Sequence, residues 1–150
     1  MLKGIDPLLT PDLLKLLAQM GHDDTLILAD ANFTAERLAV GMPLIRLPAI
    51  GMLRAVQAVT SVLPLVADEI YPVGYMHVSG KPNDYRSALQ REVMEHLQPL
   101  LLPEQRAQAI ERFEFYERTR KAFGIVLTGE MQPFGNFLLR KGVIGENLRL

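Results

Sequence analysis

The sequence predicts an α/β fold, a single layered domain in which helices flank a mainly parallel sheet. Short, nearly continuous apolar runs such as residues 25–31 are typical of strands that are buried on both faces. Stretches with apolar residues at helical spacing, such as residues 50–63, alternate with these runs along the chain. No repeat, low-complexity segment or linker interrupts the pattern, so we expect one domain over residues 1–150.

The first half of the chain is predicted to contain a helix, two strands and a second helix. Thr10 followed by Pro11 is typical of a helix start, and Gly21 predicts where that helix ends. The strands are predicted over residues 25–31 and 43–47, and the second helix over residues 50–63, ending near Pro64.

The second half is predicted to alternate in the same way. A strand over residues 71–78 precedes a helix that Asp84 caps, and Pro103 opens a further short helix. The remaining elements are a helix over residues 115–121 and strands over residues 123–128 and 136–140.

The composition excludes several classes of site. The 150 residues contain no cysteine, so disulfides, zinc–thiolate sites and cysteine nucleophiles are excluded. A formal net charge of −1 gives no basic field to attract nucleic acid or anionic lipid. No apolar stretch reaches the roughly 20 residues of a membrane helix. The first residues lack the pattern of a signal peptide, so we expect a cytoplasmic protein that binds neither nucleic acid nor membrane.

His22 precedes the first predicted strand, Asp30 lies at the end of that strand, and these two residues are the first candidates for chemistry. An imidazole can accept and donate a proton near neutral pH, although a histidine after a helix end can also simply be a favoured cation. Asp30 ends an apolar strand, where it either orients a substrate hydroxyl or caps the next turn. The sequence leaves both pairs of alternatives open.

Five further residues stand where a ligand could contact them, namely Arg112, Tyr116, Phe134, Gly135 and Asn136. Arg112 could instead be a solvated arginine and Tyr116 a packed ring. Gly135 permits close backbone approach to a ligand, and Asn136 offers directional hydrogen bonds. The alternative for this last segment is an ordinary turn that leads into a strand.

The sequence contains none of the common motifs for metal, nucleotide or covalent catalysis. His-Glu-x-x-His, Gly-x-Gly-x-x-Gly, the phosphate loop and Gly-x-Ser-x-Gly are all missing. We therefore expect no metal and no cofactor, and a chemistry that consists mainly of proton transfer. His77 and His96 are too far apart in sequence to form a local motif, and we interpret both as structural.

Several short motifs occur in order along the chain: Met20-Gly21-His22-Asp23-Asp24, Ala29-Asp30-Ala31-Asn32-Phe33, Phe115-Tyr116-Glu117-Arg118, Thr128-Gly129-Glu130 and Gly135-Asn136. Together they resemble the L-fucose mutarotase / D-ribose pyranase family, and they are closer to its fucose branch. The resemblance spans roughly residues 2–143, with residues 35–109 only loosely similar.

This resemblance implies a fold, an activity and roles for the matched residues. The implied protein is a ring-shaped homodecamer with sites at subunit boundaries. It is a cofactor-free isomerase that interconverts the α and β anomers of L-fucose or a related monosaccharide. His22 matches the catalytic proton donor, while Asp30, Arg112 and residues 134–136 match substrate-binding positions. We assign Asp30 also as a catalytic partner that orients the sugar or the imidazole, and Tyr116 as a second proton donor.

Two positions depart from the family pattern. The family usually has tyrosine where Phe134 stands, so a phenolic hydroxyl is lost at a sugar-contacting position, and such a loss can change specificity strongly. Thr34 stands where the fucose branch commonly has proline. The alternatives to a mutarotase are pyranose–furanose interconversion of D-ribose, a sugar-binding protein without turnover, and a regulatory assembly without sugar affinity.

Overall fold

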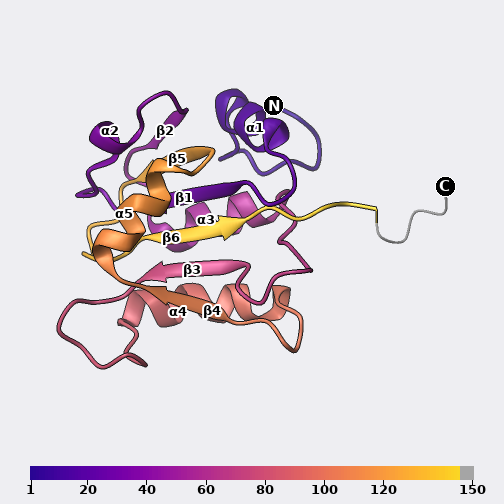
Figure 1. Cartoon of the computed structure of the whole chain (residues 1–150). Coiled ribbons are helices and arrows are strands. Elements are labelled where there is room, and N and C mark those ends of the chain that lie inside the picture. The colour runs from indigo at the N-terminus through magenta and orange to yellow at the C-terminus, as the bar shows by residue number, and fades with distance from the viewer. Residues whose placement is uncertain (146–150) are drawn as a thin grey trace.

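A six-stranded sheet lies between two layers of helices in the computed structural model, which describes residues 1–145 (Figure 1). The helices are α1 (Pro11–Gln19), α2 (Ala35–Leu38), α3 (Met52–Thr60), α4 (Ala88–Leu97) and α5 (Arg112–Arg120), with a 3₁₀ turn η1 (Gln98–Leu100) after α4. The strands are β1 (Thr25–Ala29), β2 (Leu44–Leu47), β3 (Val73–Met76), β4 (Ala107–Ile110), β5 (Gly124–Thr128) and β6 (Phe137–Arg140). Within these described residues, no helix has both the length and the apolar character needed to cross a membrane.

The strand order is β2-β5-β1-β6-β3-β4. Strand β5 pairs in parallel with β1 and β2, and β3 pairs in parallel with β4, while β6 is antiparallel to its neighbours β1 and β3. Five strands therefore run in one direction, which confirms the predicted α/β fold with a mainly parallel sheet. We call the edge where these five strands end the carboxyl edge, and the opposite edge the amino edge. Strand β6 starts at the carboxyl edge.

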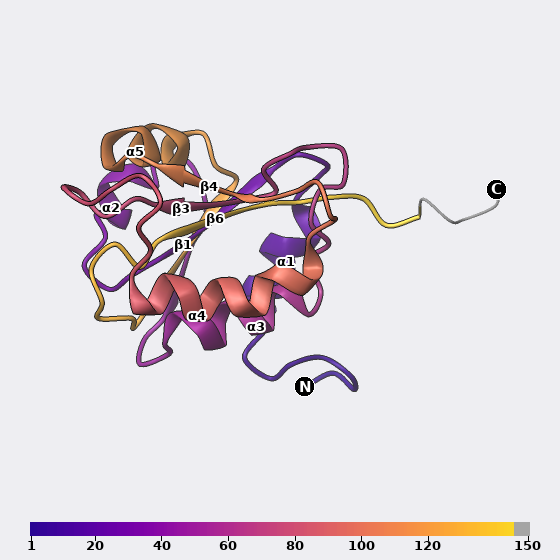
Figure 2. The same ribbon diagram turned by 90° about the horizontal axis from the view of Figure 1, so that it is seen from below.

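Each face of the sheet is covered by its own apolar core. Helices α1, α3 and α4 cover one face, and α2 and α5 cover the other (Figure 2). Along β1, Leu26 and Leu28 face the first core whereas Ile27 and Ala29 face the second, and all four are fully buried. Burial of a leucine or isoleucine side chain contributes about 1.5–3 kcal/mol, so this strand is held from both sides, as its continuous apolar run predicts.

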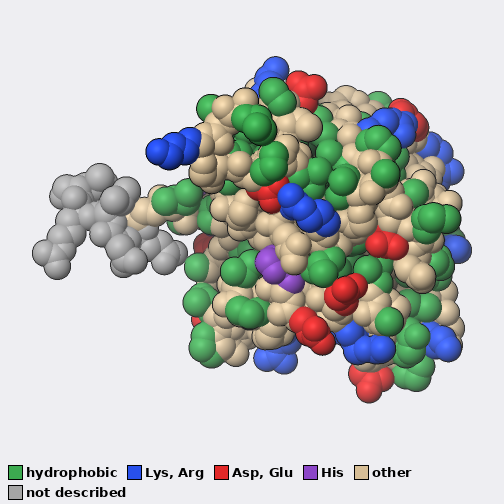
Figure 3. All heavy atoms as spheres, turned by 180° about the vertical axis from the view of Figure 1, so that it is seen from behind, with side chains coloured by type: hydrophobic (Ala, Val, Ile, Leu, Met, Phe, Trp, Pro, Cys, Tyr) green, Lys and Arg blue, Asp and Glu red, His purple; other side chains and the backbone are tan. Residues whose placement is uncertain are grey.

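The back of the molecule has charged side chains of both signs interspersed with hydrophobic ones (Figure 3). Helices α3 and α4 lie on this side of the sheet. In this view of the described residues, lysine and arginine side chains do not gather into one continuous surface.

The start of α1 is as predicted, whereas the start of α4 is not. The Thr10 hydroxyl accepts the backbone N–H of Leu13 at 3.3 Å. Asp84 lies in a turn, and Ser87 caps α4 instead. The Ser87 hydroxyl accepts the Gln90 N–H, and the Gln90 side chain accepts the Ser87 N–H in return. This capping box satisfies two backbone donors, which a lone aspartate upstream cannot do.

The prediction of a short helix opened by Pro103 was wrong, and two short elements, α2 and β4, were not predicted. The segment after Pro103 forms a turn in which the Gln105 N–H donates to the Leu102 carbonyl. The Gln105 side chain then donates to the carbonyls of Val66 and Glu69, both at 2.8 Å. These tertiary contacts stabilise the turn and lead the chain into β4, an edge strand in which only Ile110 is fully buried.

Candidate active site

The carboxyl edge of the sheet carries all but one of the predicted site residues. Asp30 directly follows β1, and Phe134, Gly135 and Asn136 directly precede β6. Arg112 is the first residue of α5, which follows β4. Because ligands of α/β sheets bind beyond the carboxyl ends of the strands, this edge is the candidate active site.

Asp30 and Asn136 form a closed pair at the centre of this edge. The Asn136 Oδ1 accepts the backbone N–H of Asp30 at 2.8 Å, and the Asn136 Nδ2 donates to Asp30 Oδ2 at 2.9 Å. The other carboxylate oxygen accepts the backbone N–H of Asn32 at 3.0 Å. The turn-capping alternative for Asp30 is therefore present. Asp30 is 3% exposed and Asn136 is 2% exposed, so both side chains have fixed orientations.

The environment of Asp30 opposes its charge. Burial raises the pKa of the Asp30 carboxyl, and the nearby charge of Glu130 acts in the same direction. Three donors lower this pKa in part: the backbone N–H of Asn32, the side-chain amide of Asn136 and the backbone N–H of Gly135. A buried carboxyl with a raised pKa at a strand end is typical of a functional site.

The segment before Asn136 has an unusual backbone. Phe134 has a φ of 60°, in the left-handed region that costs a residue with a side chain on the order of 1 kcal/mol. The next residue must be small, because a Cβ on Gly135 would lie 2.8 Å from Leu89 Cδ2 and 2.9 Å from the Gln132 carbonyl oxygen. The close approach that the sequence predicts for Gly135 is thus made to the protein itself.

Arg112 and Tyr116 lie on α5 and are both half-buried. The Arg112 guanidinium lies 4.6 Å from the centroid of the Phe113 ring, and among residues 1–145 its buried Nε has no hydrogen-bond partner. The Tyr116 ring meets the rings of Phe33 and Phe113 edge-on, with centroid distances of 5.6 and 6.0 Å. The packing alternative for Tyr116 is therefore present, and it ties α5 to the loop that follows Asp30.

His22 lies apart from the other predicted site residues. It precedes β1, whereas Asp30 follows it, so a five-residue strand of roughly 17 Å separates them. The His22 imidazole is 46% exposed at the amino edge, and its Nε2 lies 3.2 Å from Asp68 Oδ1. A carboxylate can only accept, so this contact requires the proton on Nε2 and leaves Nδ1 as the free base of neutral His22. The hydrogen bond from His22 lowers the pKa of Asp68.

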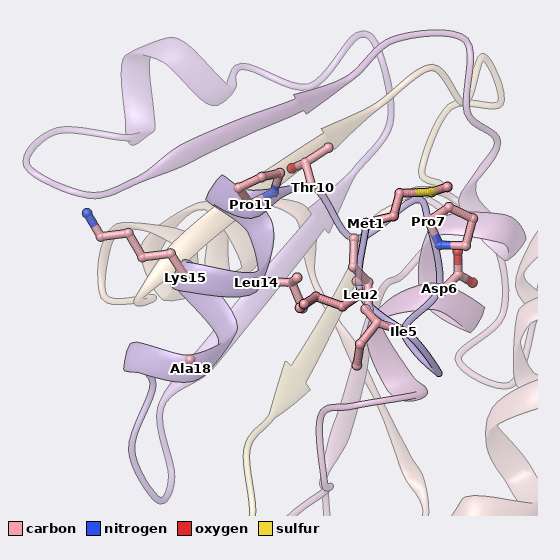
Figure 4. Close-up of a pocket in the computed structure, with 11 residues that line it drawn as sticks. Met1, Leu2, Ile5, Asp6, Pro7, Thr10, Pro11, Leu14, Lys15 and Ala18 are labelled. Carbon is pink, nitrogen blue, oxygen red and sulfur yellow. The ribbon is translucent and has the colours of Figure 1, made fainter.

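A separate cavity of about 580 Å³ lies between the amino-terminal segment and α1 (Figure 4). Its lining is mostly apolar and includes Leu2, Ile5 and Leu14. The acid that lines it, Asp6, accepts two hydrogen bonds from Arg54 at 2.6 and 2.8 Å, and these bonds lower its pKa. This carboxylate is therefore committed to an ion pair with Arg54.

Two residues that contact predicted site residues were not themselves predicted from the sequence. Asp68 contacts His22 across 46 positions, and no local spacing could indicate that contact. Gln90 is fully buried beneath the Phe134 segment. The sequence feature that could have indicated Gln90 is a polar side chain on the apolar face of a helix, beside Val93 and Leu97. Within the described residues, no three acidic or histidine side chains are grouped so that they could hold a metal ion.

Comparison with known proteins decides the family. Residues 3–144 match the RbsD / FucU transport protein family. The chain belongs to this family. Its homologues in the RbsD / FucU family include the human fucose mutarotase, which is 41% identical over 150 residues, 97% of this chain and 96% of the relative. The family match and this relative confirm the resemblance that the ordered motifs indicate. Fucose mutarotases are isomerases.

Solved structures of the RbsD / FucU family have the same fold. The fucose mutarotase from Streptococcus pneumoniae, determined in complex with L-fucose, aligns with a TM-score of 0.86 and 32% identity over 96% of this chain and all of that one. RbsD from Bacillus subtilis, determined in complex with D-ribose, aligns with a TM-score of 0.71 and 23% identity over 97% of this chain and all of that one. At that identity, the second comparison supports the fold alone.

Proposed function

We propose that this chain is a cytoplasmic mutarotase that interconverts the α and β anomers of L-fucose or a closely related monosaccharide. The observation that carries the proposal is the oriented Asp30–Asn136 pair at the carboxyl edge of a chain homologous to fucose mutarotases. A cysteine-free composition suits a reducing compartment.

The reaction needs only two proton transfers in each direction. A base takes the proton from the anomeric hydroxyl, an acid protonates the ring oxygen, and the bond between the anomeric carbon and the ring oxygen breaks. Rotation about the adjacent carbon–carbon bond in the open aldehyde presents the other carbonyl face. Closure then reverses both transfers, so the protein ends in its starting protonation state. Each well-placed acid–base group contributes on the order of 10²–10⁴-fold.

The residues of the carboxyl edge suit the binding part of this task. The Asp30 carboxylate, oriented by Asn136, accepts from sugar hydroxyls through its remaining lone pairs. The Arg112 guanidinium polarises a sugar oxygen, and the Phe134 ring and Gly135 backbone position the sugar ring. Tyr116 is the second proton donor. His22 carries the main proton transfer through its free Nδ1.

His22 reaches such a sugar only from a second copy of the chain, since it lies at the opposite edge of its own sheet. A contact between an amino edge and a carboxyl edge is heterologous, and repeated heterologous contacts form a ring when the rotation between copies closes. In line with what the family resemblance implies, we propose a ring-shaped homodecamer with sites at its subunit boundaries. Two exposed apolar side chains, Phe113 and Met131, follow Arg112 and Glu130 and offer a surface for the neighbouring copy to cover.

Nuclear magnetic resonance exchange spectroscopy tests the activity directly. We expect added protein to accelerate exchange between the α and β anomer signals of L-fucose, with D-ribose and other monosaccharides exchanging more slowly. Faster pyranose–furanose exchange of D-ribose than of fucose anomers would favour the ribose alternative. Saturable sugar binding at an unchanged exchange rate would identify a binding protein without turnover. The absence of both sugar binding and faster exchange would contradict any sugar function.

Mixing two inactive variants tests the shared site. In one variant His22 is replaced by alanine, and in the other Arg112 is. After refolding from equal amounts, half of the His22 positions and half of the Arg112 positions at the boundaries are intact. If each site uses one copy of each, about one quarter of the wild-type exchange rate returns. A mixture no faster than the average of the two separate variants would place the whole site within one chain.

A further inference from the structure

Gln90, in the first turn of α4, is fully buried, and both the oxygen and the nitrogen of its side-chain amide form hydrogen bonds. Its Oε1 accepts the backbone N–H of Ser87 at 3.0 Å. Its Nε2 donates to the carbonyl of Met76 at 2.7 Å and to the carbonyl of Phe134 at 3.0 Å. Both carbonyls can only accept, so the orientation of this amide is determined by its partners.

These hydrogen bonds join three segments that border the candidate site. The Met76 carbonyl ends β3, and the Met76 N–H donates to the Asn136 carbonyl at 3.0 Å. The Phe134 carbonyl belongs to the strained residue with a φ of 60°. Gln90 therefore ties α4 both to the end of β3, which is hydrogen-bonded to Asn136, and to the segment that leads into Asn136.

The Phe134 carbonyl and the Gly135 N–H belong to the same planar peptide unit, and they point in opposite directions. At one end of this unit the carbonyl oxygen accepts from Gln90. The Gly135 N–H lies at the other end of this unit and is one of the groups that lower the pKa of the Asp30 carboxyl. Rotation of this peptide would break the contact with Gln90 and displace the neighbouring Asn136, whose side-chain amide donates to Asp30.

We propose that Gln90 is a positioning residue of the sugar site, which holds Asn136 in place to orient Asp30 by binding the carbonyls of Met76 and Phe134. The role of Asp30 toward sugar rests on the proposed function, whereas the effect of Gln90 on Asp30 does not. Among the described residues, Gln90 is the hydrogen-bond donor to the Phe134 carbonyl. When Gln90 is removed, we expect the backbone strain at Phe134 to be relieved by rotation of this peptide.

The test replaces Gln90 by methionine, which has a similar length but no donor. We expect the pH midpoint of the Asp30 carboxyl, followed by its ¹³C resonance, to move upward because the Asn136 amide, a donor to the charged form, is displaced. Other charged or titratable groups at this edge, namely Glu130, Arg112 and His77, are unchanged in the variant. We also expect the KM for the sugar to rise about tenfold, the usual effect of losing a hydrogen bond to a charged group, with a smaller change in kcat.

Replacement of Gln105 by leucine provides a matched control. Gln105 is also buried, and it likewise donates to two carbonyls and accepts one N–H, but near the amino edge of the sheet. It should lower the melting temperature by a similar amount and leave the Asp30 midpoint in place. An unchanged midpoint in Gln90→Met, or an equal shift in both variants, would overturn the inference.

If Gln90→Met unfolds, Gln90→Leu serves the same test, because leucine is of similar size, adds no charge and cannot donate to Phe134. The Asp30 midpoint should again lie above that of the wild type, and a midpoint equal to the wild type would overturn the inference. Failure of the proposed function would give a different result. The wild-type protein would then not accelerate sugar exchange, while the Gln90 variants would still shift the pH midpoint of Asp30.

Discussion

Replacement of His22 by alanine is expected to reduce the rate of sugar anomer exchange by about 10²–10⁴-fold, the contribution of one well-placed acid–base group. The fold should be unaffected, because the His22 side chain is 46% exposed and its partner Asp68 is 70% exposed, and exposed pairs of this kind contribute little to stability. Exchange spectroscopy with L-fucose measures the rate, and thermal unfolding measures the stability.

His96 offers the matched control for this prediction. Its imidazole Nε2 lies 2.9 Å from the Thr60 hydroxyl, between α3 and α4 and away from the carboxyl edge. His96→Ala should lower the melting temperature and preserve the exchange rate per folded protein. If His22→Ala exchanges sugar anomers as fast as the wild type, the assignment of His22 as the main proton carrier is wrong.

The regular part of the fold could be predicted because local patterns determine it. The continuous apolar run that forms β1 requires burial on both sides, and Thr10 with Pro11 is sufficient to start α1. Strand β4 and the turn around Gln105 could not be predicted in this way. Their stability comes from pairing with β3 and from the carbonyls of Val66 and Glu69, which are distant in sequence.

In the candidate site, too, local sequence predicts individual residues but not the contacts that depend on the fold. Asp30 was predicted because it stands at the end of a strand, and Asn136 because its amide offers directional hydrogen bonds and matches the family motif. The antiparallel direction of β6, which brings Asn136 to the same edge, was not predicted. The mutual hydrogen bonds of Asp30 and Asn136 span 106 positions and have no sequence signature. The separation of His22 from Asp30 is a consequence of strand direction. Two residues eight positions apart lie on opposite edges when a strand runs between them, so nearness in sequence is a poor guide here.

Replacement of Asn136 by alanine should destabilise the protein by about 3 kcal/mol at neutral pH. The change leaves the buried N–H of Asp30 unpaired and removes a donor to a buried carboxylate, each of which costs roughly 1–3 kcal/mol. Urea unfolding measures this loss. Thr119→Val, which removes one buried hydrogen bond at 2.7 Å from the Phe115 carbonyl, is the control and should cost about 1 kcal/mol.

The loss in Asn136→Ala should also depend on pH, and in a direction that identifies Asp30 as the cause. Burial already holds the pKa of Asp30 above its ordinary value of 3.8, and removal of the amide donor raises this pKa further, because the donor favours the charged form. Below both pKa values the carboxyl is neutral in wild type and variant, so the destabilisation is smallest there. It grows as the pH rises through the interval between the two pKa values and is complete above both. The Thr119 control has no such dependence, and a destabilisation in Asn136→Ala that is equally flat with pH would mean that Asn136 does not stabilise the charged Asp30 carboxylate.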